Sequence, residues 1–296
     1  FHAHAGIRDC TRSLVGSEMC IRDSFLGDHD EPLWVRRALP MTVAKIGTLA
    51  AATALVEHLR EDSDEFQRRQ LIEALGALPD DIRHSVDAKI IEDQIHREAR
   101  AYLQSATDLR ALGLLDKGRF DGPCVTWTSD VLDPSLVERL LAERLDSQLR
   151  NLFGLMAVMY PPRDVWAAYR SLTSRVPALR THALEYLDNA LAGEVRRNVF
   201  AVIGDQTLDE KLHMAARQFG TVVRTKVATL DRMLSDATEE SLDENHLTLA
   251  TLYTIHTDRV TELYDRVVEL VGGAADPFVA ETASGVANRL GLSPSV

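Results

Sequence analysis

The feature that most constrains this chain is a helix signal that recurs along it. The signal first occurs as an acid-rich turn at residues 28–31, followed by Pro32, a residue suited to the first turn of a helix. Apolar residues such as Val35 are then spaced to face a core, and Gly47 is placed to end the helix. A second helix is predicted from about 49 to 60, so that this segment forms one helical hairpin.

The same signal occurs in three further segments. They occupy residues 62–78, 177–191 and 276–291. Arg68 in the second copy is in register with Arg36 in the first, the third copy is followed by a second helix at 193–203, and the last copy closes on Gly291. Helical hairpins repeated at intervals of roughly 20 to 50 residues are typical of solenoid proteins. The sequence therefore predicts an all-α fold, an α-solenoid of stacked helical hairpins.

Apolar residues at spacings of three and four predict further helices between and after these copies. They cover residues 81–115, 135–160, 208–234 and 242–271. Residues 117–130 are rich in Gly and Pro, form the one clear break in helical composition, and are predicted to be a loop. The predicted domains are an N-terminal sub-array, 25–116, and a C-terminal sub-array, 131–296, on either side of this loop.

The first residues are predicted not to belong to the native protein. Residues 13–24 look like a translated sequencing-adaptor string, and the helical pattern becomes regular only from Phe25. The chain also begins with Phe1 instead of Met, so we expect a reading frame that is truncated upstream. Residues 1–24 are therefore excluded from the predicted fold.

The four copies resemble HEAT repeats, and this resemblance implies HEAT-like hairpins that stack into a curved, partner-binding surface. A narrower resemblance covers residues 150–203. Within it, the segments 160–170 and 182–189 and the pair Arg196 and Arg197 are similar to the soluble HEAT-like tails of bacterial ADP/ATP-translocase-like and major-facilitator membrane proteins. This second resemblance implies a cytoplasmic location and a tether to an upstream membrane domain.

The composition supports packed helices and argues against two classes of partner. Of the 296 residues, 45% are hydrophobic and only 6% are aromatic. The net charge of −12 disfavours nucleic acid, because its binding depends on neutralising phosphates with Lys and Arg. The uncharged stretch 151–162 is about half of the roughly 20 residues that a membrane-spanning helix needs, so no segment is predicted to cross a bilayer. Three cysteines without metal-ligand spacing fit a reducing, cytosolic compartment.

Paired arginines and a group of aromatic residues are the candidates for an interaction surface. The pairs stand at positions 36 and 37, 68 and 69, and 196 and 197. Either they form a basic stripe, or one Arg of each pair bonds to acidic or carbonyl groups of an adjoining turn while the other is solvated. The aromatic residues either form a hot spot for a partner or pack between adjacent hairpins. They are Tyr160, Trp166, Tyr169, Tyr186 and Phe200. The predicted interaction surface comprises Arg37, Arg69, Trp166, Tyr169 and Arg197.

No pattern in the sequence predicts a catalytic, metal or cofactor site. Asp93 and His96 lie one helical turn apart, a spacing used in di-iron bundles, but without a second copy we expect an exposed helix face. His182 and Glu185 have the same spacing and are assigned to packing or a hydrogen bond. Cys124 has no His close by in the sequence, which favours a partly buried thiol over a nucleophile. Serine-nucleophile, phosphate-loop and zinc-protease motifs are absent from the sequence.

These observations predict a non-catalytic protein–protein interaction scaffold, as a regulatory tail of a transporter-like protein or as an adaptor that binds a peptide or helix. The alternative is a HEAT-like enzyme of the glycosylase or lyase type with an acidic concave pocket. The sequence departs from such enzymes, because it is acidic where a glycosylase needs a basic groove. It also has no His-Glu dipeptide of the kind used by HEAT-like hydroxylases.

Overall fold

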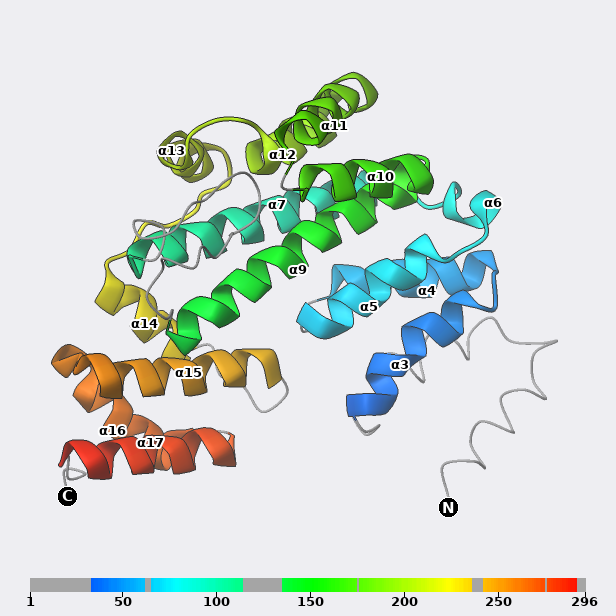
Figure 1. Cartoon of the computed structure of the whole chain (residues 1–296). Coiled ribbons are helices and arrows are strands. Elements are labelled where there is room, and N and C mark those ends of the chain that lie inside the picture. The colour runs from blue at the N-terminus through cyan, green and yellow to red at the C-terminus, as the bar shows by residue number, and fades with distance from the viewer. Residues whose placement is uncertain are drawn as a thin grey trace, which may run out of the picture. The chain divides into compact units, whose positions relative to one another are not determined.

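The computed structural model shown in Figure 1 describes six stretches of the chain. They are residues 33–61, 65–113, 135–174, 176–235, 242–274 and 276–291. All regular structure in these stretches is helical and none of it is strand, which confirms the all-α prediction for the described residues. None of these helices is long and apolar enough to cross a bilayer, as expected. The predicted non-native segment 1–24 and the predicted loop 117–130 lie outside the described residues.

The chain divides into two compact units. The first unit comprises residues up to Gln94 together with Gly154–Arg163, and the second comprises Ile95–Phe153 together with the residues from Asp164 onward. Two long helices, α7 (Ala88–Ala111) and α9 (Leu136–Met159), contribute residues to both units.

The first unit is built on three helices that pack against one another. They are α3 (Leu33–Ala44), α4 (Leu49–Arg60) and α5 (Glu65–Gly76). A single turn of helix, α6 (Asp80–Arg83), packs on α4. The core between these helices is aliphatic, with Leu55, Leu59, Leu71 and Leu75 fully buried, as expected from the period of apolar residues in α4 and α5.

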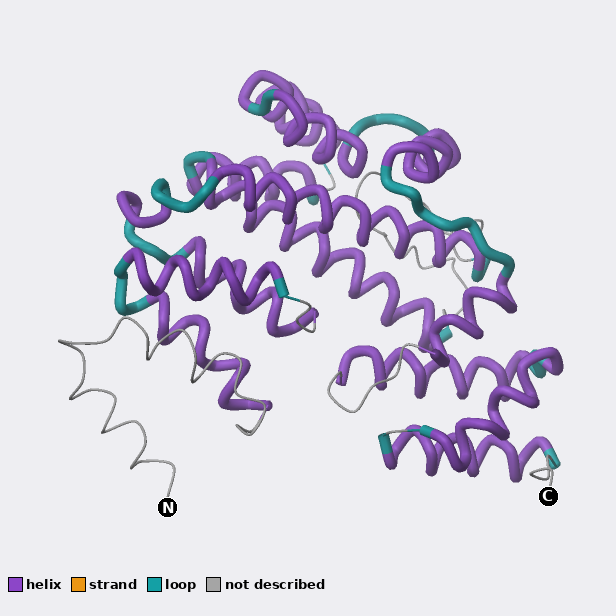
Figure 2. The backbone as a smooth tube through the Cα atoms, turned by 180° about the vertical axis from the view of Figure 1, so that it is seen from behind, coloured by secondary structure: helices purple, strands orange, loops and turns teal. Residues whose placement is uncertain are grey.

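The second unit holds the remaining helices apart from the first two residues of α10, and the described helices are drawn in purple in Figure 2. In chain order after α9 they are α10 (Pro162–Leu172), α11 (Pro177–Ala190), α12 (Gly193–Ile203), α13 (Leu208–Gln218), α14 (Lys226–Ser235), α15 (Leu242–Asp258), the short 3₁₀ helix η1 (Thr261–Leu263), α16 (Tyr264–Gly273) and α17 (Pro277–Leu290). Helix α15 packs on α14 and α17, and α16 packs closely on α17.

Several predicted helix ends are confirmed. Helix α9 ends at Met159, immediately before Tyr160 and the Pro161–Pro162 pair, and α12 covers the predicted residues 193–203. Helix α17 begins after Asp276, whose carboxylate accepts hydrogen bonds from the backbone of Phe278 and Val279. It ends at Gly291, which has the positive φ of 70° that favours glycine at this position.

Two predicted helical segments are interrupted. The segment 208–234 is split into α13 and α14, because the chain leaves the helix at Phe219 and turns at Gly220, where φ is +64°. The β-branched run that follows has low helix propensity. The segment 242–271 is split into α15 and α16 near Arg259, a non-glycine residue with φ of 51°.

Helices α3–α4–α5, here called the first triplet, and α11–α12–α13, the second triplet, share one buried contact. Arg68, the fourth residue of α5, donates from Nη1 to the carbonyl of Leu59 near the end of α4, at 3.1 Å. Lys211, the fourth residue of α13, donates from Nζ to the carbonyl of Val202 near the end of α12, at 2.8 Å. In both triplets a buried cation of the third helix therefore satisfies a carbonyl that the end of the second helix leaves without an intrahelical partner.

Candidate protein-interaction surfaces

Helix α11 presents apolar side chains to solvent. Its buried side consists of Ala183, Leu184 and Leu187. Leu179 and Tyr186 lie outside this side, two helical turns apart and therefore in one row, with 45% and 40% of their surfaces exposed. Val176, which precedes the helix, is also exposed. We call Val176, Leu179 and Tyr186 the α11 apolar face.

The second triplet is less closely packed than the first. In the first triplet α3 packs closely on α5, and the guanidinium of Arg37 lies 4.4 Å from the ring centre of Phe66. In the second triplet α11 packs on α12, which separates it from α13 (Figure 1). An ion pair joins Arg196 of α12 to Asp188 of α11, with Nε and Oδ1 2.9 Å apart.

Tyr186 sits at the edge of this face beside an acidic side chain. The pKa of its phenol is raised, first by partial burial and second by the nearby carboxylate of Asp164. The phenol is therefore neutral at physiological pH. A neutral tyrosine with an apolar ring and a polar tip is the kind of residue that protein interfaces use as an anchor.

The predicted aromatic residues of α10 pack within the fold. The rings of Trp166 and Tyr169 meet edge to face at 5.5 Å, and Tyr169 meets Phe153 of α9 at 5.2 Å. The guanidinium of Arg150 lies 5.6 Å from the ring centre of Trp166. Both aromatic residues are only partly exposed, and these contacts favour the interpretation in which they pack between helices.

The predicted arginines are each held by a neighbour of the same unit. Arg37 and Arg69 belong to the first unit, and Arg197 belongs to the second together with Trp166 and Tyr169. Arg69 pairs with Glu73 at 3.2 Å and Arg197 with Glu194 at 2.7 Å, both along the surface of one helix. Exposed pairs of this kind contribute about 0.3–0.5 kcal/mol.

The other arginine of two pairs has a structural role, as the second interpretation of the pairs predicts. Arg68 is buried and bonds to the Leu59 carbonyl and, through Nη2, to Oε1 of Gln94 at 2.8 Å. Arg196 bonds to Asp188 of the preceding helix and lies over the ring of Phe200. The side chain of Arg36 lies outside the described residues.

The candidate metal residues that the structure describes lie on helix surfaces. Asp93 is exposed and pairs with Lys89 at 3.2 Å, while the ring of His96 stacks on Phe219 at 5.0 Å. His182 and Glu185 are exposed and 3.7 Å apart. No group of three or more His, Cys, Asp or Glu residues suited to a metal occurs among the described residues, and Cys124 lies outside them.

Sequence reasoning missed a second candidate surface, the segment 219–225 between α13 and α14. Gln104 of α7 accepts a hydrogen bond from the N–H of Val222 at 2.8 Å and donates one to the carbonyl of the same residue at 3.1 Å. One amide can reach both groups of a single residue only where the backbone is extended. The run Thr221-Val222-Val223 after a glycine was the signal that could have indicated this break.

Gln104 is itself held by a buried carboxylate. Its Nε2 donates to Oδ1 of Asp108 at 3.0 Å, and Arg232 of α14 donates to Oδ2 of Asp108 at 2.7 Å. Burial raises the pKa of Asp108, while the charge of Arg232 and the Gln104 hydrogen bond oppose that rise. The extended segment is thus anchored through three linked side chains of α7 and α14.

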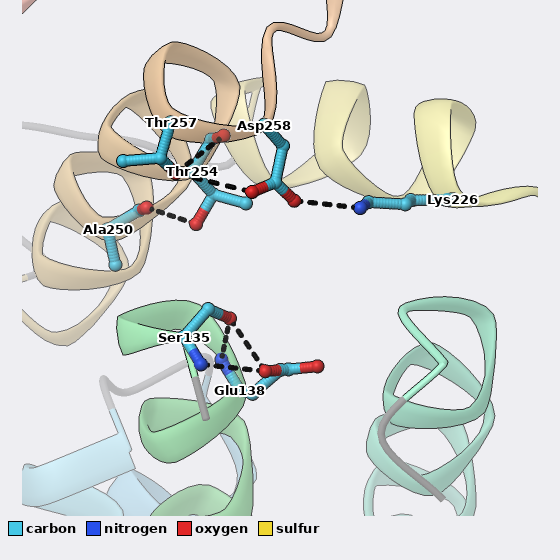
Figure 3. Close-up of polar contacts among 7 residues, drawn as sticks. All are labelled: Ser135, Glu138, Lys226, Ala250, Thr254, Thr257 and Asp258. Atoms are coloured by element: carbon cyan, nitrogen blue, oxygen red, sulfur yellow. Dashed lines mark hydrogen bonds and ion pairs between the residues drawn. The ribbon is translucent and has the colours of Figure 1, made fainter. Parts of the chain in front are cut away.

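The start of α14 is fixed by a further ion pair, drawn in Figure 3. Nζ of Lys226 lies 2.8 Å from Oδ2 of Asp258 at the end of α15. Thr257 donates to the carbonyl of Thr254 at 3.2 Å in the same turn of α15. The extended segment therefore ends where α14 begins, at a residue that is held by an ion pair to α15.

Comparison with known proteins returned no match to a protein-family model, to a curated protein or to a solved structure. The surfaces described above are accordingly the basis on which a function can be argued. They consist of exposed apolar groups on a helical framework.

Proposed function

We propose that this protein is a non-catalytic scaffold that binds partner proteins through exposed faces of a HEAT-like α-solenoid. The observation that carries the proposal is the α11 apolar face. Its leucine and tyrosine lie in one row on a helix whose adjacent side is packed, which is the arrangement that a partner helix or loop can cover.

The size of the face fits a binding anchor. Burial of a large apolar side chain contributes about 1.5–3 kcal/mol relative to leaving it in water. Leu179 and Tyr186 are each little more than half buried, so a partner would gain part of this free energy at each position. A few such residues supply most of the binding free energy in many interfaces.

The two triplets support the solenoid part of the proposal. Each has three successive helices, a buried cation at the same place in the third helix, and a hydrogen bond to the end of the second. Repetition of one hairpin contact in separate parts of a chain is expected where a structural unit is repeated.

The experiment compares capture of partners by two variants of the whole chain. Leu179→Lys combined with Tyr186→Lys places charges on the α11 apolar face, and Phe278→Lys changes a more exposed apolar residue on α17 as a control. Immobilised proteins are incubated with lysate of the source organism, and bound proteins are quantified by mass spectrometry. We expect at least one protein to be retained by the native chain and by the control but reduced about tenfold by the double variant.

Both variants must show the far-UV circular dichroism of the native chain. A set of captured proteins that is unchanged by the double variant would contradict the proposal that this face binds a partner.

The resemblance of residues 150–203 to transporter-associated tails extends the proposal to a cytoplasmic location beside a membrane domain. Translation of the locus upstream of the codon for Phe25 tests this extension. A series of long apolar segments there would support it, and an upstream frame without such segments would contradict it.

A further inference from the structure

Helix α15 is buried on most of its surface and open along one narrow side. It packs on α14 and on α17 (Figure 1), and residues on its packed sides, such as Leu252 and Ile255, are fully buried. The open side carries Tyr253, which is 54% exposed, together with exposed or partly exposed neighbours. We call this side the α15 stripe; it consists of His246, Leu249, Tyr253 and His256.

The residues of the α15 stripe are spaced by three, four and three positions. Side chains at this spacing lie in one row along an α-helix. The same spacing forms the narrow seam along which two helices pair in coiled coils. The α15 stripe therefore has the geometry of a surface that another helix can cover.

The α15 stripe carries no charge, unlike the exposed sides of the helices that follow it. Residues 245–257 contain no Asp, Glu, Lys or Arg, although these types make up 26% of the chain. By contrast, α16 exposes Glu269 and α17 exposes Glu281. A helix without a charged side is usually covered all round, whereas a surface helix has charged residues facing the solvent. This difference singles out α15 among the three last helices as one whose open side is suited to burial.

The order of residues along the α15 stripe matches a second copy of the same stripe. If two copies of α15 pair antiparallel about a point level with residue 251, His246 of one copy lies opposite His256 of the other. In the same register Leu249 lies opposite Tyr253. A neutral imidazole has one donor and one acceptor, so one histidine can hydrogen-bond to another, and a leucine can pack on a tyrosine ring. Such a self-complementary patch is what a two-fold symmetric interface requires.

We propose that the α15 stripe is the contact of a symmetric homodimer in which two copies of α15 pair antiparallel. One pair of helices buries less area than a standard interface, so we expect a weak dimer with a dissociation constant on the order of 10–100 μM. This dimer goes beyond the proposed function, because it needs no other protein and uses a different surface from the α11 apolar face.

Sedimentation velocity of the whole chain, from about 1 to 500 μM, measures the dimer. We expect a monomer at the lowest concentration and a dimer at the highest. Leu249→Lys and Tyr253→Glu each place a charge against an apolar residue twice in every dimer, and each should weaken dimerisation at least about tenfold. The double variant Leu179→Lys and Tyr186→Lys on α11 is the control and should dimerise as the native chain does. Circular dichroism establishes that the variants are folded.

Mixing two variants tests the register. In the antiparallel dimer a Leu249→Lys chain and a Tyr253→Glu chain place their new charges opposite each other, so the mixture should form a heterodimer within about threefold of the native affinity. The matched mixture combines Leu249→Lys with Leu249→Glu. Its charges are opposite only in a parallel pair and lie about 6 Å apart along the axis of the antiparallel pair, so its rescue should be weaker.

Three outcomes would overturn the proposed dimer. They are a native chain that stays monomeric up to about 500 μM, a dimer whose affinity is unchanged by folded Leu249→Lys and Tyr253→Glu variants, and rescue by the matched mixture alone. A monomeric native chain that still captures a protein through the α11 apolar face would leave the proposed function standing without the dimer. Loss of that capture with an intact dimer would do the reverse.

Discussion

The first and second triplets contain the same clamp, a buried cation of the third helix bonded to a carbonyl near the end of the second, but differ in how their outer helices meet. In the first, α3 packs on both α4 and α5, and Val43 of α3 is buried at 7% exposure. In the second, the main contact of α11 within its triplet is with α12, and Tyr186 of α11 is 40% exposed. A shared contact between two neighbouring helices therefore does not determine whether the third helix closes over them.

The clamps themselves also differ in chemistry. Arg68 has a planar guanidinium, so it can bond to Leu59 and Gln94 together. Lys211 has a compact ammonium group whose charge can be lost. Burial lowers its pKa from 10.5 to about 8, the neighbouring Arg180 adds to this effect, and Asp205 opposes it. The first clamp is expected to be stronger and independent of pH, and the second weaker and dependent on pH.

The largest effect is expected when the first clamp is removed. Arg68→Met keeps the length of the side chain but leaves the Leu59 carbonyl and the Gln94 amide without their buried donor. We expect a loss of about 3 kcal/mol in the free energy of unfolding of the first unit. Urea unfolding measures this loss, and hydrogen exchange in α4 and α5 reports the stability of these two helices. A loss below about 1 kcal/mol would show that the clamp does not hold this triplet together.

The next effect compares the outer helices. Val43→Lys introduces a charge into a buried position of α3, whereas Tyr186→Lys introduces one at an exposed position of α11. We expect a loss of about 2 kcal/mol for the first variant and less than about 0.5 kcal/mol for the second, measured by thermal and urea unfolding. Equal losses would mean that Tyr186 of the α11 apolar face is as well covered as Val43 of α3.

The smallest effect concerns the pH dependence of the second clamp. Because the pKa of Lys211 is about 8 in the folded chain and 10.5 when unfolded, the unfolded chain binds more protons between these values. The contribution of this lysine to the free energy of unfolding should therefore rise as the pH rises through that window. We expect a rise on the order of 1–2 kcal/mol relative to Lys211→Met, which cannot titrate.

The measurement is urea unfolding of both proteins from pH 7.5 to 10.5, followed through the second unit. Arg68→Met serves as the control, since its difference from the native chain should not vary over this range. Parallel pH curves for the native chain and Lys211→Met would show that Lys211 keeps an ordinary pKa.

Local signals predicted most of the helices but few of the surfaces. Pro177 and Gly193 start helices, and Asp276 and Gly291 cap one, because each acts on backbone groups only a few residues away. The break at 219–225 was missed because its apolar residues also fit a helical period, and because its partner, Gln104, is far away in the sequence.

The residues of the candidate surface also show what local signals do not predict. Trp166 and Tyr169 were predicted as interaction residues from their type, which did not indicate that their rings contact each other or that Tyr169 contacts Phe153. Tyr186 was among the aromatic residues considered and Leu179 was not, yet the two share the exposed row. Residue type alone does not state which side of a helix its neighbours leave uncovered.

The sequence by itself determined that the described chain is helical, where many of its helices begin and end, and which residues could fill a core. These properties depend on hydrogen bonds and side-chain periods within a few turns of one helix. Only the tertiary structure decided that α3 is covered where α11 is not, and that Gln104 holds an extended segment in place of a strand. Both depend on which distant element reaches a given face, a matter of packing between segments that no local pattern encodes.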